Sequence, residues 1–396
     1  MIHITDKKNC CGCSACAQRC PKQCITMQGD SEGFLYPTVD TAQCIDCGLC
    51  EKVCPIITPS QPRDPQKVYA SYNKDEETRL KSSSGGIFTL LAQQTIDKGG
   101  VVFGVRFDEH WMPIFDYTLT GDGIAAFRGS KYVQATVGNA YRQAEAFLKE
   151  GREVLFSGTP CQIAGLKHYL RKEYSNLLTV DIICHGVPSP RVWGMYVDEL
   201  CAKESRRSKQ KAIIQSVSFR DKSRGWKSFH ISIAFSTGHT YKRLFHRDYY
   251  MRTFVGDATL RPSCYDCKAK SGRSNSDITI ADFWGIHVVD PSLDDDKGCG
   301  AIFINTPKGD SCYPYEQCIN SEKSLRDVVS NNTSYHTSSQ PHPKRERFFA
   351  TLQQTNSVTR SVQKVLIPSL ARRILARIKR HALSLIRKIR KSLNKQ

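Results

Sequence analysis

The sequence predicts an α+β protein in three parts: a small cysteine-dense head, a mixed α/β body and a basic helical tail. Ten of the 18 cysteines lie within the first 54 of 396 residues. The middle of the chain alternates short apolar runs with helical periods, which favours an α/β core. Residues 361–396 contain eleven Lys or Arg and no Asp or Glu. We place the head at 1–58, a Pro-marked linker at 59–66, the body at 67–330 and a connector with the basic tail at 331–396.

The composition indicates a folded protein without an export signal. Apolar residues make up 40% of the chain and aromatic residues 9%, enough for at least one full core. The first residues, MIHITDKKNC, contain no apolar segment of the kind that directs secretion. We therefore expect a cytoplasmic protein whose cysteines bind metal or stay free. No run approaches the roughly 18 apolar residues of a membrane-spanning helix.

The head contains one cysteine spacing twice, C-x2-C-x2-C-x3-C-P. The two copies are Cys10, Cys13, Cys16, Cys20 and Cys44, Cys47, Cys50, Cys54. In this spacing three thiolates on a short loop bind three corners of a [4Fe-4S] cluster, while the fourth reaches the neighbouring cluster. The predicted ligand sets are Cys10, Cys13, Cys16 with Cys54 (cluster one), and Cys44, Cys47, Cys50 with Cys20 (cluster two).

The doubled spacing resembles bacterial dicluster ferredoxins. The alternative is a zinc ribbon or a set of free thiols. Zinc sites pair two Cys-x-x-Cys knuckles and do not need the third and fourth cysteine of each copy. Cys11 and Cys24 fall outside the spacing, and we expect both to be small buried residues.

In the body, strand-like runs such as VVFGVRF (101–107), EVLF (153–156) and LLTVDII (177–183) alternate with helical segments such as 85–100, 139–151 and 190–203. After Ala212 the pattern is mostly strands, which favours a mixed sheet over a parallel one. Cys161 and Cys184 each follow a predicted strand, on the side of an α/β sheet where ligands gather. Cys264 and Cys267 form a later Cys-x-x-Cys pair. Spacing alone does not join these four cysteines into one site.

Six stretches resemble, in order, the beta-subunit family of coenzyme F-420-reducing hydrogenase and its dehydrogenase relatives. They are KSSSGGIFT, FRGSKYVQA, SGTPCQIAGLK, CHGVPSP, FRDKSRGW and CYDCKAKSGRSNSDITIADFWG. The resemblance implies FAD, a third [4Fe-4S] cluster and, in archaeal members, a deazaflavin site; plant relatives reduce a hydroxymethyl chlorophyll. It also implies that Cys161, Cys184, Cys264 and Cys267 bind the third cluster. An incidental pair or a zinc site with the same four thiolates is the alternative.

The same resemblance predicts the flavin contacts. Ser83, Ser84, Gly85 and Gly86 open a helix whose backbone N–H groups would face the pyrophosphate; a plain helix cap is the alternative. Arg128, Ser130 and Lys131 meet phosphate or form a solvated basic turn. Gly158, Thr159 and Pro160 line the flavin ring or shape the Cys161 loop. His185 either donates a proton or only hydrogen-bonds locally, and no catalytic residue is assigned. Five further residues are expected at the pocket: Arg220, Arg224, Trp226, Asp282 and Trp284.

The tail pattern predicts an amphipathic basic helix. Apolar residues recur at steps of three or four from Ala371 to Leu393, with arginines and lysines on the other faces. Such a helix docks on a membrane surface, at the inner face of the cell membrane, or on an acidic partner; a loosely ordered solvated tail is the alternative. No specific nucleic-acid binding is expected, because no aromatic residue follows Phe349.

Together these features predict an iron–sulfur flavoprotein oxidoreductase. Electrons from a ferredoxin or another redox protein would enter the head and reach the flavin, which would reduce or oxidise an organic substrate that the motifs do not specify. One alternative is a non-catalytic electron-transfer subunit of a larger complex. The other is a regulatory or scaffold protein that keeps only the two head clusters.

Overall fold

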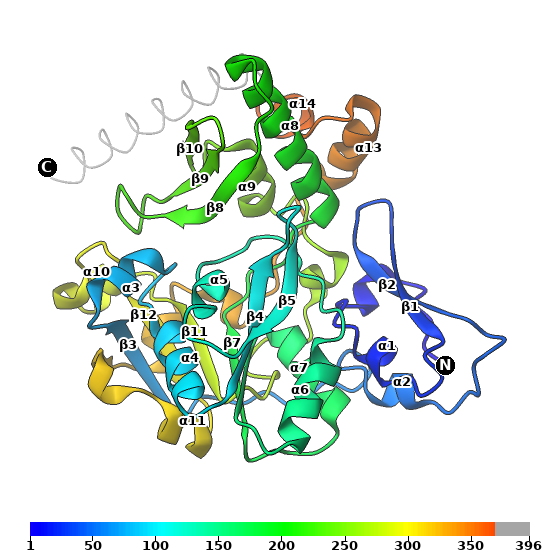
Figure 1. Ribbon diagram of the computed structural model, residues 1–396, viewed down its shortest axis with the longest axis vertical. Helices are drawn as coiled ribbons and strands as arrows, with labels where there is room; N and C mark the ends of the chain where they lie inside the picture. Colours follow the sequence, from blue (N-terminus) through cyan, green and yellow to red (C-terminus); the bar gives the residue numbers. More distant parts are fainter. Residues whose placement is uncertain (369–396) are drawn as a thin grey trace, which may run out of the picture.

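The computed structural model describes residues 1–368. It confirms the α+β class, with a small head beside a larger mixed α/β body (Figure 1). Among the described residues, no helix combines the length and the apolar character needed to cross a membrane. The predicted basic helix from Ala371 to Leu393 lies outside the described part.

The head is a β-hairpin with two short helices. Its elements are η1 (Lys7–Asn9), α1 (Ala15–Arg19), β1 (Ile25–Gly29), β2 (Leu35–Val39) and α2 (Leu49–Lys52). Strands β1 and β2 pair antiparallel, Ile25 opposite Val39. Each short helix follows a residue in the left-handed region, Ser14 before α1 and Gly48 before α2. These turns follow directly after a cysteine loop, so the loop conformation is fixed at both repeats.

The body is built on an eight-stranded sheet of order β13-β3-β12-β11-β7-β6-β4-β5. Its strands are β3 (Lys67–Asn73), β4 (Val101–Phe107), β5 (Pro113–Thr118), β6 (Val154–Ser157), β7 (Leu177–Ile182), β11 (Ile278–Asp282), β12 (Gly300–Ile304) and β13 (Cys318–Glu322). The neighbours β4, β6, β7 and β11 are parallel, and the outer pairings are antiparallel. The predicted mixed sheet is confirmed, although the prediction includes neither edge strand, β5 or β13.

Helices cover both faces of this sheet. On one face α4 (Ile87–Asp97) packs through Ile87 and Leu91 on the apolar residues of β6 and β7. On the other face α6 (Ala140–Lys149) and α7 (Pro160–Leu170) pack on Phe103 and Phe156. The remaining short elements of the body are α3 (Glu76–Lys81), α5 (Ile124–Phe127), η2 (Pro262–Asp266), α10 (Ile286–Val289), η3 (Pro291–Leu293), α11 (Pro307–Cys312), η4 (Tyr315–Gln317), α12 (Leu325–Val329) and η5 (Thr333–Tyr335).

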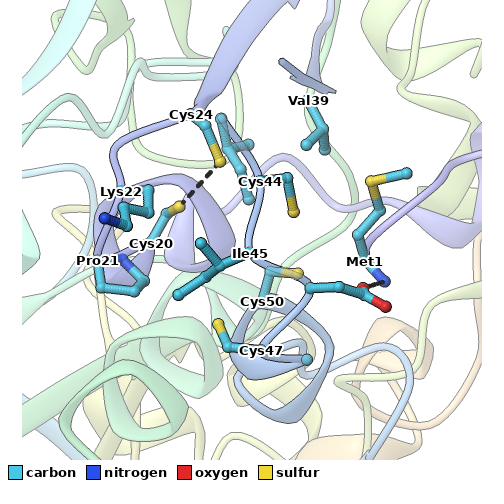
Figure 2. Close-up of a pocket in the computed structure, with 13 residues that line it drawn as sticks. Met1, Cys20, Pro21, Lys22, Cys24, Val39, Cys44, Ile45, Cys47 and Cys50 are labelled. Atoms are coloured by element: carbon cyan, nitrogen blue, oxygen red, sulfur yellow. Dashed lines mark hydrogen bonds and ion pairs between the residues drawn. The ribbon is translucent and has the colours of Figure 1, made fainter. Parts of the chain in front are cut away.

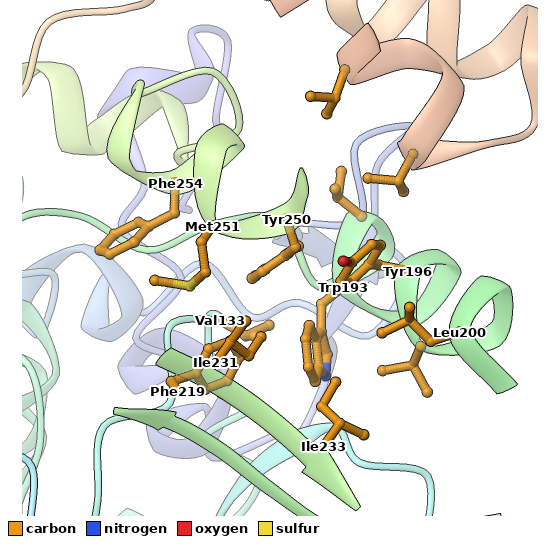
Figure 3. Packing of buried hydrophobic residues seen from close by; sticks show 14 of the residues in the cluster. Val133, Trp193, Tyr196, Leu200, Phe219, Ile231, Ile233, Tyr250, Met251 and Phe254 are labelled. Atoms are coloured by element: carbon orange, nitrogen blue, oxygen red, sulfur yellow. The ribbon is translucent and has the colours of Figure 1, made fainter. Parts of the chain in front are cut away.

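A second layer lies over the carboxyl ends of the parallel strands (Figure 1). It consists of the sheet β8 (Ile214–Asp221), β9 (His230–Phe235) and β10 (Thr240–Leu244) with α8 (Pro190–Ser208), α9 (Tyr249–Val255), α13 (Arg345–Thr355), α14 (Val358–Ser361) and the π-helical turn η6 (Val362–Leu366). Its core is aromatic: Trp193 packs against Tyr250 and Phe219 (Figure 3).

The segment predicted as an exposed connector is instead part of the body. Phe348, Phe349 and Leu352 of α13 are buried in the core of the second layer, and Tyr335 is buried against Phe303 of the main sheet. The Asn, Ser, Thr and Pro residues between 331 and 346 dominate the local composition, but the aromatic residues decide where the segment packs. The folded body therefore continues past residue 330 to at least residue 366.

Candidate functional site

The main site of the body is a cleft between the eight-stranded sheet and the second layer. It has a volume of about 640 Å³, within the usual range for a small-molecule or cofactor site. Nine of the ten predicted flavin contacts line it: Ser83, Ser84, Gly85, Gly86, Ser130, Lys131, Gly158, Thr159 and His185. The tenth, Pro160, occupies the first turn of α7 beside it. Four separate sequence blocks therefore meet in one cleft.

The Ser-Ser-Gly-Gly loop requires its glycines because the backbone passes very close to the sheet. A Cβ on Gly85 would lie 2.4 Å from the carbonyl oxygen of Ser71 and 2.9 Å from the nitrogen of Gly300. Gly86 caps α4 with φ of 84°, in the left-handed region. The positive end of an 11-residue helix thus opens directly into the cleft.

The serines of this loop join it to neighbouring segments. The Ser83 hydroxyl accepts hydrogen bonds from the Ser130 backbone (2.6 Å) and from the Ser130 hydroxyl (2.9 Å). The Ser84 hydroxyl donates to the Cys299 carbonyl at 2.8 Å. Two predicted phosphate-binding blocks, 83–86 and 128–131, are therefore held side by side.

Three buried cations lie behind the loop: Arg79, Arg220 and Lys222. Arg79 pairs with Asp295 (2.6 Å), and Arg220 pairs with Asp282 (2.9 Å). Lys222 donates to three carbonyl oxygens, including Ser84 at 3.2 Å. Burial, followed by the charges of Arg220 and Arg79, lowers the pKa of Lys222 to about 7. Two carboxylates among three cations leave this wall positive when Lys222 is protonated, which suits an anionic ligand.

Lys131 has a structural contact in addition to its place on the cleft wall. Its ammonium donates to the carbonyls of Ala126 (3.0 Å), Arg128 (3.1 Å) and Gly129 (3.3 Å). Burial lowers the pKa of Lys131 to about 7. The amine therefore stabilises its own turn, while the predicted phosphate contact stays a prediction.

The opposite end of the cleft is aromatic. Trp284, Phe229, Phe245 and Phe254 line it, and Phe254 stacks on Tyr132 at 4.6 Å between ring centroids. Of the residues expected at the pocket, Arg220, Asp282 and Trp284 line the cleft. Trp226 is buried beneath Trp284 (4.8 Å between ring centroids) and donates to Asp282, and neither it nor Arg224 lines the cleft. The cleft thus has a polar, positive end and a flat apolar end.

The Cys161 loop begins α7 with a capping box. Gln162 accepts hydrogen bonds from the Thr159 backbone and hydroxyl, both at 2.9 Å, and Pro160 fills the first helical position. The Thr159 hydroxyl also lies 3.3 Å from the Cys161 sulfur. Gly158 and Thr159 therefore both line the cleft and shape the cysteine loop.

His185 follows Cys184 on the cleft wall and is fixed by a carboxylate. Its Nε2 lies 2.6 Å from Asp257, and its ring meets Phe254 edge-on. An imidazole held in this way keeps one orientation toward the cleft.

The four body cysteines predicted to act together are brought together at one end of the cleft. Burial, with the thiols of Cys161 and Cys267, raises the pKa of Cys184 to about 12. Burial, followed by the thiol of Cys184, also raises the pKa of Cys264. The backbone N–H of Val187 donates to the Cys264 sulfur at 3.4 Å. These buried thiols release their protons only to a group that stabilises several thiolates at once, and a bound metal centre does this.

In the head, the cysteines predicted for cluster two line one pocket. These are Cys20, Cys44, Cys47 and Cys50, and Cys24 joins them (Figure 2). Cys24 is buried as expected, with its sulfur 3.4 Å from that of Cys20. Cys47 is exposed and Cys44 half-buried. This pocket opens toward solvent.

The cluster-one cysteines are all buried: Cys10, Cys13, Cys16 and Cys54. Burial, with the thiols of Cys10 and Cys54, raises the pKa of Cys16 to about 12. This grouping places Cys54 with the first repeat, as the exchange of fourth cysteines requires. Across residues 1–368, no three His, Cys, Asp or Glu side chains have the geometry of a single-ion site.

The cluster-one end of the head packs directly against the body. A Cβ on Gly165 of α7 would lie 2.9 Å from the Cys13 sulfur. Cys11 is buried between the two cysteine sets: the Cys13 thiol is the main reason that the pKa of Cys11 is raised, and the Cys11 thiol is the main reason for the raised pKa of Cys161. Cysteine thiols thus run without interruption from the head to the cleft.

Sequence reasoning missed several cleft residues. Phe229, Phe245, Met251 and Phe254 come from the second layer, and Asn331 to Ser334 come from the supposed connector. No spacing marks these residues, because their position depends on how the second layer folds over the sheet. Arg261, buried against the head, was also missed.

Comparisons with known proteins agree with this arrangement. A model described as 4Fe-4S dicluster domain matches residues 9–56. Two models describe the beta subunit of coenzyme F420 hydrogenase/dehydrogenase: the one for its N-terminal part matches 68–141, and the one for its C-terminal part matches 151–321. The chain belongs to this beta-subunit family and carries a dicluster iron–sulfur domain at its head. It is an iron–sulfur protein of the oxidoreductase type.

Individual relatives cover parts of the chain. The F-type subunit of the F(420)H(2) dehydrogenase of Methanosarcina mazei is 25% identical over 44% of this chain and 53% of its own length. The Coenzyme F420-dependent sulfite reductase of Methanocaldococcus jannaschii is 26% identical over 41% of this chain and 26% of its own length. This chain therefore spans about half of the first relative and a quarter of the second. A chain of the F420-reducing [NiFe] hydrogenase complex from Methanosarcina barkeri has 17% identity, covers 76% of this chain and 93% of its own, and has a TM-score of 0.45.

Proposed function

We propose that this chain is a flavin-dependent iron–sulfur oxidoreductase whose cleft holds FAD and whose four body cysteines hold a third [4Fe-4S] cluster. The observation that carries the proposal is the shared cleft. Nine predicted flavin contacts line it together with Cys184, one of the predicted cluster ligands. A flavin placed there would lie next to the third cluster.

The residues present fit the two cofactors. Gly85, Gly86 and the positive end of α4 suit a pyrophosphate, and the aromatic end around Trp284 suits a flat ring system. Bound there, FAD would supply hydride chemistry toward an organic substrate, and the clusters would supply single electrons. His185, oriented by Asp257, would hold a proton at the cleft wall.

The geometry supports one order of electron transfer. The cluster-two end of the head faces solvent at Cys47, so a ferredoxin or another redox protein would dock there. Cluster one would pass electrons across Cys11 to the third cluster at Cys161. The names of the relatives, one part of a dehydrogenase and one a reductase that depends on coenzyme F420, make a deazaflavin the first substrate to test.

The test is anaerobic purification of the full chain followed by measurement of iron, acid-labile sulfide, zinc and flavin. We expect about twelve irons and one FAD per chain, with about four irons lost in Cys264→Ala. Cys201→Ala, in a half-buried cysteine outside all three sets, should lose none. Gly85→Ala should lose the flavin and keep the iron, because its methyl group would collide with the Ser71 carbonyl. Zinc in place of the third group of irons, or no flavin, would contradict the proposal.

The non-catalytic alternative is favoured by one observation: a matched relative is named as one component of a dehydrogenase. A flavin-loaded chain that accepts electrons from a reduced ferredoxin, but reduces no deazaflavin in solution, would support it.

A further inference from the structure

One arginine differs from the other buried arginines of this protein. Among the described residues, Arg79, Arg220 and Arg261 are the buried arginines. Arg79 and Arg220 each pair with an aspartate. Arg261 is fully buried, yet within residues 1–368 no carboxylate lies within ion-pair distance of it. An unpaired buried charge costs several kcal/mol unless another group compensates it.

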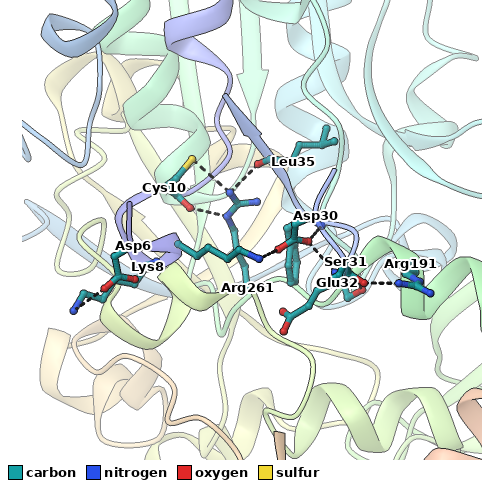
Figure 4. A network of polar contacts seen from close by, with 12 residues as sticks. Asp6, Lys8, Cys10, Asp30, Ser31, Glu32, Leu35, Arg191 and Arg261 are labelled. Atoms are coloured by element: carbon teal, nitrogen blue, oxygen red, sulfur yellow. Dashed lines mark hydrogen bonds and ion pairs between the residues drawn. The ribbon is translucent and has the colours of Figure 1, made fainter. Parts of the chain in front are cut away.

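The guanidinium of Arg261 points from the body into the head. Its Nε donates to the Cys10 carbonyl (2.7 Å), and one terminal nitrogen contacts the Cys10 sulfur (3.5 Å) and the Leu35 carbonyl (2.8 Å) (Figure 4). The other terminal nitrogen donates to Gln134 at 3.0 Å. The ring of Tyr36 lies 4.3 Å from the guanidinium carbon. All of these contacts are neutral groups, so the charge itself is uncompensated by them.

The head loop is shaped to admit this side chain. Gly12, between Cys10 and Cys13, has φ of 72°, and a Cβ there would lie 2.7 Å from an Arg261 nitrogen. Three residues after Arg261 comes Cys264, a predicted ligand of the third cluster. One side chain therefore spans the two cysteine sets.

We propose that Arg261 is the built-in counter-charge of cluster one and raises its reduction potential relative to a cluster without a buried cation. A cluster bound by four thiolates is negatively charged, and one-electron reduction adds a further negative charge. A cation in a low-dielectric site stabilises the reduced state more than the oxidised one. The electron arriving from cluster two would then be held at the head–body contact, next to Cys11 and Cys161. This inference rests on the proposed iron–sulfur function, and Arg261 acts in it as a positioning residue.

The test is an EPR-monitored redox titration of the full chain, with Arg261→Gln and Arg261→Lys. The signal that disappears in Cys16→Ala identifies cluster one. At a fixed potential, Arg261→Gln should lower the ratio of reduced to oxidised cluster one about tenfold, equivalent to about 59 mV for one electron. Arg261→Lys, which keeps the charge, should stay near the wild-type ratio. The cluster-two signal should not move in either variant.

Arg345→Gln is the matched control. Arg345 also connects the body to the head, through Glu32, but its contacts include no cysteine. It should leave both potentials unchanged, which separates loss of charge at cluster one from looser docking of the head. An unchanged cluster-one potential in Arg261→Gln would overturn the inference in favour of a packing role.

If Arg261→Gln does not retain cluster one, Arg261→Lys decides. A lysine variant with iron and a wild-type potential supports the counter-charge, and loss of iron in both variants overturns it. Failure of the proposed function is distinguishable, because the wild-type chain itself would then lack the expected iron.

Discussion

The two cysteine repeats of the head have the same spacing and opposite surroundings. At the cluster-two end, Cys47 is exposed and the pocket opens toward solvent. At the cluster-one end, every cysteine is buried, α7 covers Cys13, and Arg261 supplies a cation. The spacing sets what the repeats bind, whereas the surroundings set what each cluster can do. One end is suited to accept electrons from a partner and the other to deliver them to the body.

The largest expected difference between the two ends follows from removing one ligand at each. Cys47→Ala and Cys16→Ala should each lose about four irons. Only Cys16→Ala leaves Arg261 buried without its counter-charge, and removing one partner of a buried charge pair costs about 3–5 kcal/mol. We therefore expect Cys16→Ala to lower the unfolding midpoint clearly more than Cys47→Ala, as measured by anaerobic thermal unfolding. Equal losses of stability would remove the distinction between the two ends.

The parts of this arrangement that the sequence could predict are those with local spacing. The doubled cysteine pattern separates the two head sets, and the blocks 83–86, 128–131 and 157–161 predict most of one wall of the cleft. Arg261 could not be predicted, because its partner Cys10 lies 251 residues away and no pattern links the two. The aromatic wall at Phe229 and Phe254 depends likewise on the packing of the second layer.

The connector shows a different reason for a missed prediction. Between 331 and 346, turn-forming residues outnumber apolar ones, so composition indicates an exposed loop. Tyr335 alone anchors the middle of this segment in the core, and Asn332 donates to the Asp282 carbonyl beside the cleft. A single buried aromatic residue is too weak a sequence signal to outweigh its neighbours, although it is enough to place the chain.

A smaller effect tests how closely the cluster-one end contacts the body. Gly165 of α7 and Gly194 of α8 both lie inside helices, where Gly→Ala normally stabilises by up to about 1 kcal/mol. A methyl group on Gly194 meets only Met112, at 3.8 Å, whereas on Gly165 it meets Cys13 below 3.0 Å. Gly165→Ala should therefore destabilise by about 1–3 kcal/mol, and Gly194→Ala should not. Denaturant unfolding checks both, and stabilisation by Gly165→Ala would show that the head yields freely at this contact.

The smallest effect concerns the ion pair that holds the hairpin loop of the head. Glu32, between β1 and β2, pairs with Arg345 of α13, and both side chains are mostly buried. Hydrogen bonds to charged groups in such positions contribute about 1.5–3 kcal/mol, so Glu32→Gln should destabilise by about 2 kcal/mol. The exposed pair of Lys81 and Glu77 is the control, and Glu77→Gln should cost no more than about 0.5 kcal/mol. Because Glu32 contacts no cysteine, its loss should loosen the head while leaving both cluster potentials in place. A shift of the cluster-one potential in Glu32→Gln would mean that docking, and not the charge of Arg261, distinguishes the two ends.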